Sequence, residues 1–293
     1  MSEILSMFSS PLMQRAFIVA ILVGLSAPVV GTYLVQRRLA LLGDGIGHIS
    51  LTGVALGWLV GGVVGVSPND ALAVPGAILI SVLGAILIEV VRAHGRTSGD
   101  VALAILFYGG IAGGVILIKI AGGTTTNLTS YLFGSIATVS SEDVWFTVVL
   151  AIIVLGVGLG LRGPLFALSH DEEFARASGL PTGLLNILVA VVAALTVSVS
   201  MRVVGVLLVS AVMIVPVAVG QLISHSFART MRIAMLIGVV ACVTGLTITY
   251  FLAASPGAMI VVLLVGAYAV TALLKIILQA LTSKHTPQIG ASA

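Results

Sequence analysis

Long uncharged apolar runs, separated by short clusters of charged residues, fill almost the whole chain. A helix needs about 20 apolar residues to cross a hydrocarbon core of ~30 Å, and eight runs are near or above that length. They cover residues 16–36, 45–69, 71–88, 101–118, 144–161, 177–201, 203–228 and 233–274. The last run is too long for one crossing, and the stretch ASPGA (254–258) supplies a break because proline removes a backbone donor. The pattern predicts an all-α, polytopic membrane protein with about nine (eight or nine) transmembrane helices.

The composition excludes a water-soluble globule. Of 293 residues 59% are hydrophobic, only 13 are Lys or Arg and 10 are Asp or Glu, and the mean hydropathy is +1.25. The apolar runs are continuous and do not alternate, which argues against a β-barrel. The single Cys242 excludes an internal disulfide and a cysteine-based metal cluster. The small positive charge needs no nucleic acid to explain it, since the basic residues collect in a few loops.

The distribution of Lys and Arg predicts the orientation of the chain in a bacterial cell membrane. It predicts that the N-terminus lies outside and the C-terminus in the cytoplasm. Residues 1–293 are expected to form a single membrane domain. Only Arg15, Lys119 and Arg202 then lie outside. Glu89 and Asp100 flank one basic loop, where they can pair with arginines. The cytoplasmic cations are Arg37, Arg38, Arg92, Arg96, Arg162, Arg176, Arg229, Arg232, Lys275 and Lys284.

Two segments between the runs are unlike ordinary spans. Residues 122–143 are half polar and lie outside in this topology, so they form either a short helix that dips into the membrane or a surface loop. Residues 168–183 hold the densest charge cluster. Here Ser169 or Asp171 can cap a helix of about two turns near residues 170–180, Glu172 can pair with Arg176, and Gly179 can end it. Such a helix is either a docking element for another protein or a solvated loop helix.

The stretch LLGDGIGHIS (41–50) places Asp44 and His48 one helical turn apart in an apolar region. Ionisable residues within a membrane are costly and therefore candidates for function. The i, i+4 spacing puts a carboxylate and an imidazole on one helix face, where both can ligate a zinc, manganese or iron ion. Two ligands make an open site of the kind that transport needs. The alternative is that Asp44 caps the helix and His48 bonds a neighbouring carbonyl group.

Enzymatic chemistry has little support in the sequence. There is no phosphate-binding G-x-x-x-x-G-K-[ST] motif, no G-x-S-x-G and no H-E-x-x-H. The glycine-rich FYGGIAGG (107–114) lies within an apolar run and has no lysine. Energy from a nucleotide must therefore come from a separate subunit, and we expect no enzyme activity and no permanently bound cofactor.

The stretch VQRRLALLGDGIGHISLTGVALG (35–57) resembles the membrane subunits of zinc/manganese ATP-binding-cassette importers, a group within the metal and cobalamin type. The resemblance continues in order through NLTSYLFGSIATVSSEDV (127–144), DEEFARASG (171–179) and VVGVLLVSAVMIVPVAV (203–219). It implies a homodimer that joins two ATPase subunits holding the ATP, and an extracytoplasmic metal-binding protein that delivers the ion. One departure is FLAASPGA (251–258), where many relatives carry an acidic or polar residue.

The resemblance also implies roles for particular residues. Asp44 and His48 would belong to the metal pathway, and a short helix over 127–137 would form an outer gate. The coupling helix would dock in a groove of the ATPase. The coupling residues are Asp171, Glu172, Glu173, Arg176 and Gly179, and the gate residues are Asn127, Ser130, Tyr131 and Phe133.

The choice of cargo stays open between zinc and manganese, because aspartate and histidine ligate both ions. RRLALLGDGIGH and RAHGRTSGDVAL look like zinc-uptake permeases, which favours zinc. The alternatives are a siderophore or cobalamin permease, which is usually longer and lacks the Asp44 and His48 pair, and a secondary transporter. A secondary transporter calls for paired broken helices and several buried acids, and only Asp44 is a strong candidate for such an acid.

Overall fold

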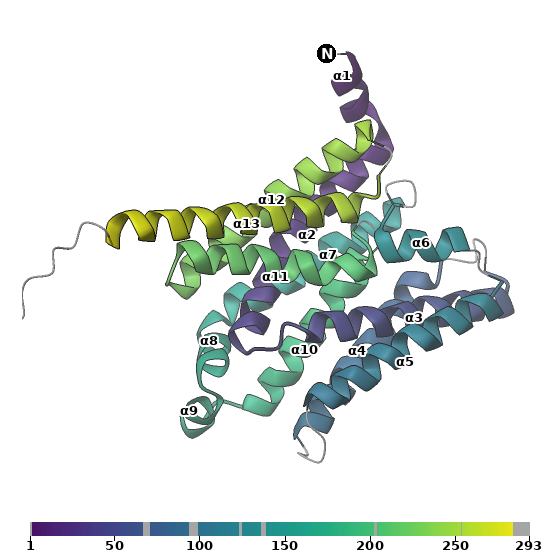
Figure 1. Cartoon of the computed structure of the whole chain (residues 1–293). Coiled ribbons are helices and arrows are strands. Elements are labelled where there is room, and N and C mark those ends of the chain that lie inside the picture. The colour runs from purple at the N-terminus through teal and green to yellow at the C-terminus, as the bar shows by residue number, and fades with distance from the viewer. Residues whose placement is uncertain are drawn as a thin grey trace, which may run out of the picture.

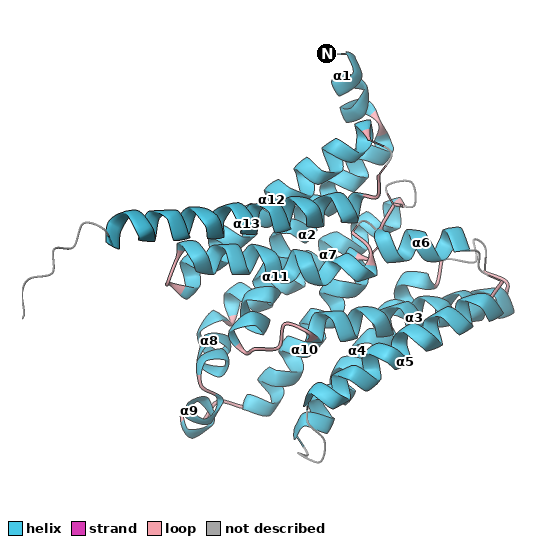
Figure 2. Ribbon diagram, viewed as in Figure 1, coloured by secondary structure: helices cyan, strands magenta, loops and turns pink. Residues whose placement is uncertain are grey.

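The computed structural model describes residues 2–66, 71–93, 99–122, 125–135, 139–201, 204–252 and 254–283. Every regular element within these ranges is a helix (Figures 1 and 2). The helices are α1 (Ser2–Ser9), α2 (Pro11–Gln36), α3 (Leu42–Val64), α4 (Ala73–Ala93), α5 (Gly99–Ile120), α6 (Thr125–Phe133), α7 (Ser141–Gly160), α8 (Arg162–His170), α9 (Glu172–Ala177), α10 (Thr182–Ser200), α11 (Val206–Ile223), α12 (Phe227–Phe251) and α13 (Pro256–Ser283).

In the described part of the chain, eight helices are long and apolar enough to cross a membrane: α2, α3, α4, α5, α7, α10, α12 and α13. A shorter apolar helix, Leu208–Ile223 within α11, lies beside them. The all-α polytopic fold and the count of eight to nine helices are therefore confirmed.

The long apolar run at 233–274 is divided where the sequence predicts the break. Helix α12 ends at Phe251, Leu252 has extended backbone, and α13 begins at Pro256. Proline is well placed in the first turn of a helix, because its missing N–H would have no partner there. The break turns one run into two antiparallel crossings.

Glycines allow several helices to approach closely, as expected for packing in lipid. A Cβ on Gly53 of α3 would lie 2.7 Å from the Cα of Ala77 in α4. A Cβ on Gly24 of α2 would lie 2.8 Å from the Cα of Val239 in α12. At these positions the backbone of the neighbour occupies the space that a side chain would need.

The bundle has two distinct ends. The end of α2, the end of α4 and helices α8 and α9 meet at one of them, where Arg37, Glu89 and Glu172 lie close together. We call this the inner end, after the predicted topology, and the opposite one, where α6 packs against Trp58, the outer end. The assignment of the inner end to the cytoplasm stays a prediction.

The short helix expected near residues 170–180 is present as α9, and a further helix, α8, precedes it. Residues 168–183 include the end of α8, a break at Asp171, and the six-residue helix α9. The expected outer helix at 127–137 lies at Thr125–Phe133 and is followed by Gly134 with a φ of 76°. Residues 136–138 fall outside the described residues.

Candidate metal pathway and coupling elements

Asp44 and His48 lie on the first two turns of α3 but not at the mouth of the bundle. Gly110, which packs on the His48 backbone, lies near the middle of α5, and Gly84, which packs on Ile49, lies near the middle of α4. Helix α3 therefore begins inside the inner ends of its two neighbours, as Figure 1 shows. This places the imidazole near the mid-height of the bundle.

Asp44 opens onto a cavity of about 310 Å³ between α3 and α5. The carboxylate is half-buried in the first turn of α3, where a helix N-terminus favours negative charge. The rim is exposed, with Leu41 at 68% and Tyr108 at 69% exposure. The rest of the lining is mainly apolar: Gly45, Leu103, Ala104 and Phe107. A cation in this cavity would find one protein carboxylate and few competing polar groups.

His48 is buried behind Phe107 and does not line that cavity. Its side chain is 4% exposed, and the Phe107 ring stands edge-on to the imidazole with the ring centroids 4.1 Å apart. Its Nδ1 is buried without a hydrogen-bond partner among the described residues. Leu41, not Asp44, is the N-cap of α3. The capping alternative therefore has no support at Asp44 or at Nδ1 of His48.

Close contact between α3 and α5 fixes the position of His48. A Cβ on Gly110 would lie 2.6 Å from the carbonyl carbon of His48, so only glycine fits. The Thr52 hydroxyl donates a hydrogen bond of 2.8 Å to the Gly110 carbonyl oxygen. On the opposite side, a Cβ added at Gly47 would lie 3.3 Å from the carbonyl oxygen of Val206 in α11. The α3 backbone is thus held on two sides at the level of the imidazole.

The donor set of one chain is small. No group of three or more His, Cys, Asp or Glu side chains that could hold a metal ion occurs in the ranges that the structure describes. One carboxylate and one imidazole suit a borderline divalent ion. Alone they hold it weakly, and in this conformation Phe107 separates the imidazole from the cavity of Asp44.

The local structure of α9 agrees with the caps and the pair expected from its sequence. The Asp171 carboxylate accepts a hydrogen bond of 2.9 Å from the Phe174 N–H, Glu172 lies 3.5 Å from Arg176, and Gly179 adopts a φ of 81°. Glu172 points inward, while Glu173 is exposed and Phe174 is 65% exposed. The outward side of α9 is therefore formed by Glu173 and Phe174.

Helix α6 packs mainly against α11 and α13 and touches α3 through one aromatic pair. Tyr131 is 7% exposed and packs edge-on against Trp58, with ring centroids 5.4 Å apart. Ser130 is half-buried, Phe133 is 38% exposed, and the side chain of Asn127 lies outside the described residues. The role of these four residues as an outer gate stays a prediction.

Two sets of residues at these sites were missed in the sequence. Phe107 and Tyr108, which line the cavity of Asp44, belong to FYGGIAGG, and nothing in that stretch identifies the helix that they face. The inner-end ion pair of Arg92 with Glu89, 2.7 Å long, was expected. The contact of Arg37 with Glu172 was not, because it joins elements far apart in the sequence.

The eight long apolar helices, with a half-buried carboxylate and a buried imidazole on one of them, form the bundle of a multi-pass membrane protein. The model of the ABC 3 transport family matches residues 9–275, and the chain belongs to this family.

Relatives and a solved structure agree with this assignment. The chain is 34% identical over 249 residues to the manganese import system permease protein ScaB of Streptococcus parasanguinis, covering 85% of each chain. It is 30% identical to the manganese transport system membrane protein MntC of Halalkalibacterium halodurans, covering 85% of this chain and 82% of the relative. PsaBC from Streptococcus pneumoniae in complex with Fab has a similar fold, with a TM-score of 0.80 and 30% identity over 92% of this chain and 94% of the other.

Proposed function

We propose that this chain is the membrane-spanning permease subunit of an ATP-driven importer for a divalent transition metal ion. Asp44 and His48 handle the ion, and α9 couples the permease to a separate ATPase. The observation that supports this most is the buried imidazole of His48. Among the described residues its Nδ1 has no hydrogen-bond partner, and its ring packs against Phe107, which lines the cavity of Asp44. A buried polar atom without a partner is costly, and an ion in transit would supply the missing partner.

The proposal includes a second copy of the chain and two kinds of partner. One chain offers two ligands, so two chains facing each other with their Asp44 cavities would offer four. When the two copies separate, the bound ion would keep only two of the four ligands and would be released. The energy for this change would come from ATP bound by the ATPase. An extracytoplasmic metal-binding protein would deliver the ion at the outer end, where α6 lies. In this arrangement the N-terminus is outside and the C-terminus is in the cytoplasm.

Manganese is the first ion to test, because the relatives ScaB and MntC are named for manganese. The sequence-based preference for zinc stays a prediction. Carboxylate and imidazole ligands do not separate the two ions. The cargo therefore has to be measured directly.

The test is uptake of radiolabelled manganese and zinc by cells or proteoliposomes that contain the complete importer, each with the other ion as competitor. We expect uptake that requires ATP and falls at least tenfold in Asp44→Ala and in His48→Ala, with the permease still present in the membrane. Glu142→Gln is the matched control, since this exposed carboxylate lies at the start of α7 and far along the chain from the pair. Wild-type uptake by both pathway variants would contradict the proposed roles.

A further inference from the structure

The segment that joins α2 to α3 is a hydrogen-bonded turn that leads into the first turn of α3, where Asp44 lies. The Leu39 N–H bonds to the Leu34 carbonyl oxygen at 2.8 Å, and the Arg38 N–H bonds to that of Val35 at 3.1 Å. Together with a φ of 58° at Arg38, this is the Schellman arrangement that ends a helix. The Leu42 N–H then bonds to the Leu39 carbonyl oxygen at 3.0 Å, and α3 starts. A displacement of the turn would therefore move the first turns of α3.

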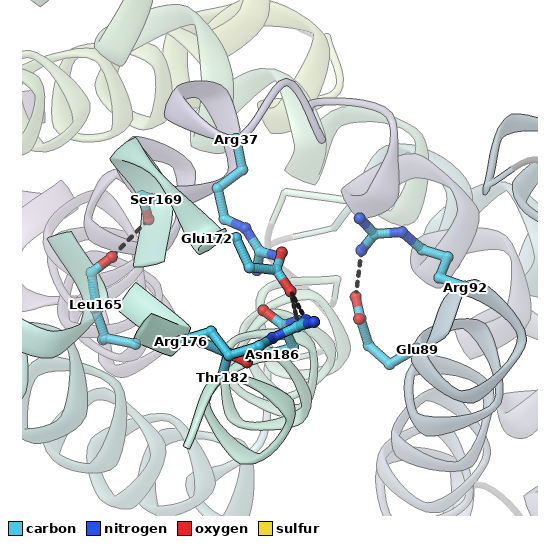
Figure 3. A network of polar contacts seen from close by, with 9 residues as sticks. All are labelled: Arg37, Glu89, Arg92, Leu165, Ser169, Glu172, Arg176, Thr182 and Asn186. Carbon is cyan, nitrogen blue, oxygen red and sulfur yellow. Dashed lines mark hydrogen bonds and ion pairs between the residues drawn. The ribbon is translucent and has the colours of Figure 1, made fainter. Parts of the chain in front are cut away.

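Arg37 connects this turn to the coupling helix. Its side chain is 6% exposed and its Nη2 lies 3.5 Å from Oε2 of Glu172, the first residue of α9 (Figure 3). Burial is the main influence on the pKa of Arg37 and lowers it. The charges of Glu89 and Glu172 raise this pKa, and the charge of Arg92 lowers it. Its Nη1 is buried and has no hydrogen-bond partner among the described residues. Glu172 is therefore the carboxylate that directly pairs with a largely desolvated guanidinium.

Glu172 is also held from two other directions. Its Oε1 accepts a hydrogen bond of 3.0 Å from the Asn186 amide in α10 and lies 3.5 Å from Nη2 of Arg176 (Figure 3). The carboxylate thus joins the end of α2, the helix α9 and the start of α10. The exposed residues Glu173 and Phe174 remain available on the outward side. An ATPase can therefore bind the outward side of α9 without breaking the contact of Arg37 with Glu172.

From these contacts we propose that Arg37 is a positioning residue, which transmits movement of α9 through the 37–41 turn to Asp44. This rests on the proposed function, since it assigns the path by which the ATPase acts on the metal pair. Arg37 itself binds neither the ion nor the ATPase. Its loss would leave both ends of the importer working but disconnected.

The test compares the number of ions transported per ATP in the complete importer, reconstituted with its ATPase and its solute-binding protein. We expect Arg37→Gln to retain at least half of the ATP hydrolysis but to transport at least tenfold fewer ions per ATP. Metal binding by the Arg37→Gln permease alone should stay within twofold of wild type. Arg37→Lys keeps the charge and should recover part of the coupling. Arg229→Gln, at an exposed cation in α12, is the matched control and should behave as wild type.

The ion pair itself is tested by a double-mutant comparison. Glu172→Gln should lower the ions per ATP as Arg37→Gln does, and the double variant should be no worse than the single ones, since residues in contact are not additive. Glu172→Gln also serves if Arg37→Gln does not fold. A merely structural role would lower the yield of folded importer and leave the ions per ATP unchanged.

The outcomes separate this proposal from the function on which it rests. Suppose that the wild-type importer takes up metal with ATP. An unchanged number of ions per ATP in the folded Arg37→Gln and Glu172→Gln variants, or fully additive losses in the double variant, would then overturn the role of Arg37 alone. A wild-type importer that moves no metal with ATP would overturn the proposed function and this role with it.

Discussion

Gly110 of α5 lies directly against the backbone of His48 in α3: a Cβ added at Gly110 would stand 2.6 Å from the His48 carbonyl carbon. We expect Gly110→Ala to push the two helices apart, at a cost of about 1–3 kcal/mol as for other overpacked sites, and to lower metal uptake several-fold. Gly109→Ala is the matched control, because nothing lies within 4 Å of its added Cβ. Uptake and the thermal midpoint of the purified permeases measure the difference, and equal values for both variants would contradict the contact.

Phe107 separates His48 from the cavity of Asp44. We expect Phe107→Ala to let the imidazole join the carboxylate, so that the isolated permease binds manganese or zinc about tenfold more tightly and releases it more slowly. Phe107→Leu keeps an apolar side chain in place and should bind as wild type does. Equilibrium dialysis with the radiolabelled ion measures the affinity. An unchanged affinity in the alanine variant would mean that Phe107 does not shield His48.

The cap of α9 depends on Asp171, which accepts the hydrogen bond from the Phe174 N–H. Loss of such a cap costs about 1 kcal/mol, and a helix of six residues has few other bonds to hold it. We expect Asp171→Ala to weaken the binding of the ATPase subunit about fivefold, whereas Asp171→Asn keeps an acceptor and should bind normally. A pull-down titration with purified ATPase measures both, and equal affinities for the two variants would argue against a capping role.

The first turn of α13 is packed against the segment before α11 and the end of α6. A Cβ on Gly257 would collide with the Val204 carbonyl oxygen and would lie 2.9 Å from that of Phe133. We expect Gly257→Ala to lower the thermal midpoint of the permease by several degrees, while Gly266→Ala, in the same helix with open space around it, should not. Scanning fluorimetry in detergent tests this, and a stable Gly257→Ala permease would show that the turn can move aside.

Features that depend on neighbouring residues were predictable from the sequence. Hydropathy gives the spans, Pro256 gives the break before α13, and the i, i+4 pair of Glu172 with Arg176 follows from helix geometry. Helix α8 was missed because Gly163 and Pro164 suggest a loop. Both lie in its first turn, where missing or unpaired N–H groups do no harm.

Features that depend on helix pairing could not be predicted in the same way. Nothing in the spacing of α3 reveals that Phe107 covers His48, or that Arg37 reaches Glu172, because each contact joins distant parts of the chain. The depth of Asp44 has the same origin. It follows from where α3 starts relative to α4 and α5, and hydropathy measures the length of a span but not its offset from its neighbours.

The inward offset of α3 also determines which residues accompany an ion on the last part of its passage. An ion that leaves Asp44 towards the inner end passes beyond α3 after less than one further turn, while α4 and α5 continue. In the proposed homodimer, the remaining walls would include those two helices and the neighbouring copy. Substitutions near the start of α5 should accordingly change mainly the rate at which the ion is released. Substitutions on α3 should change mainly the affinity for the ion.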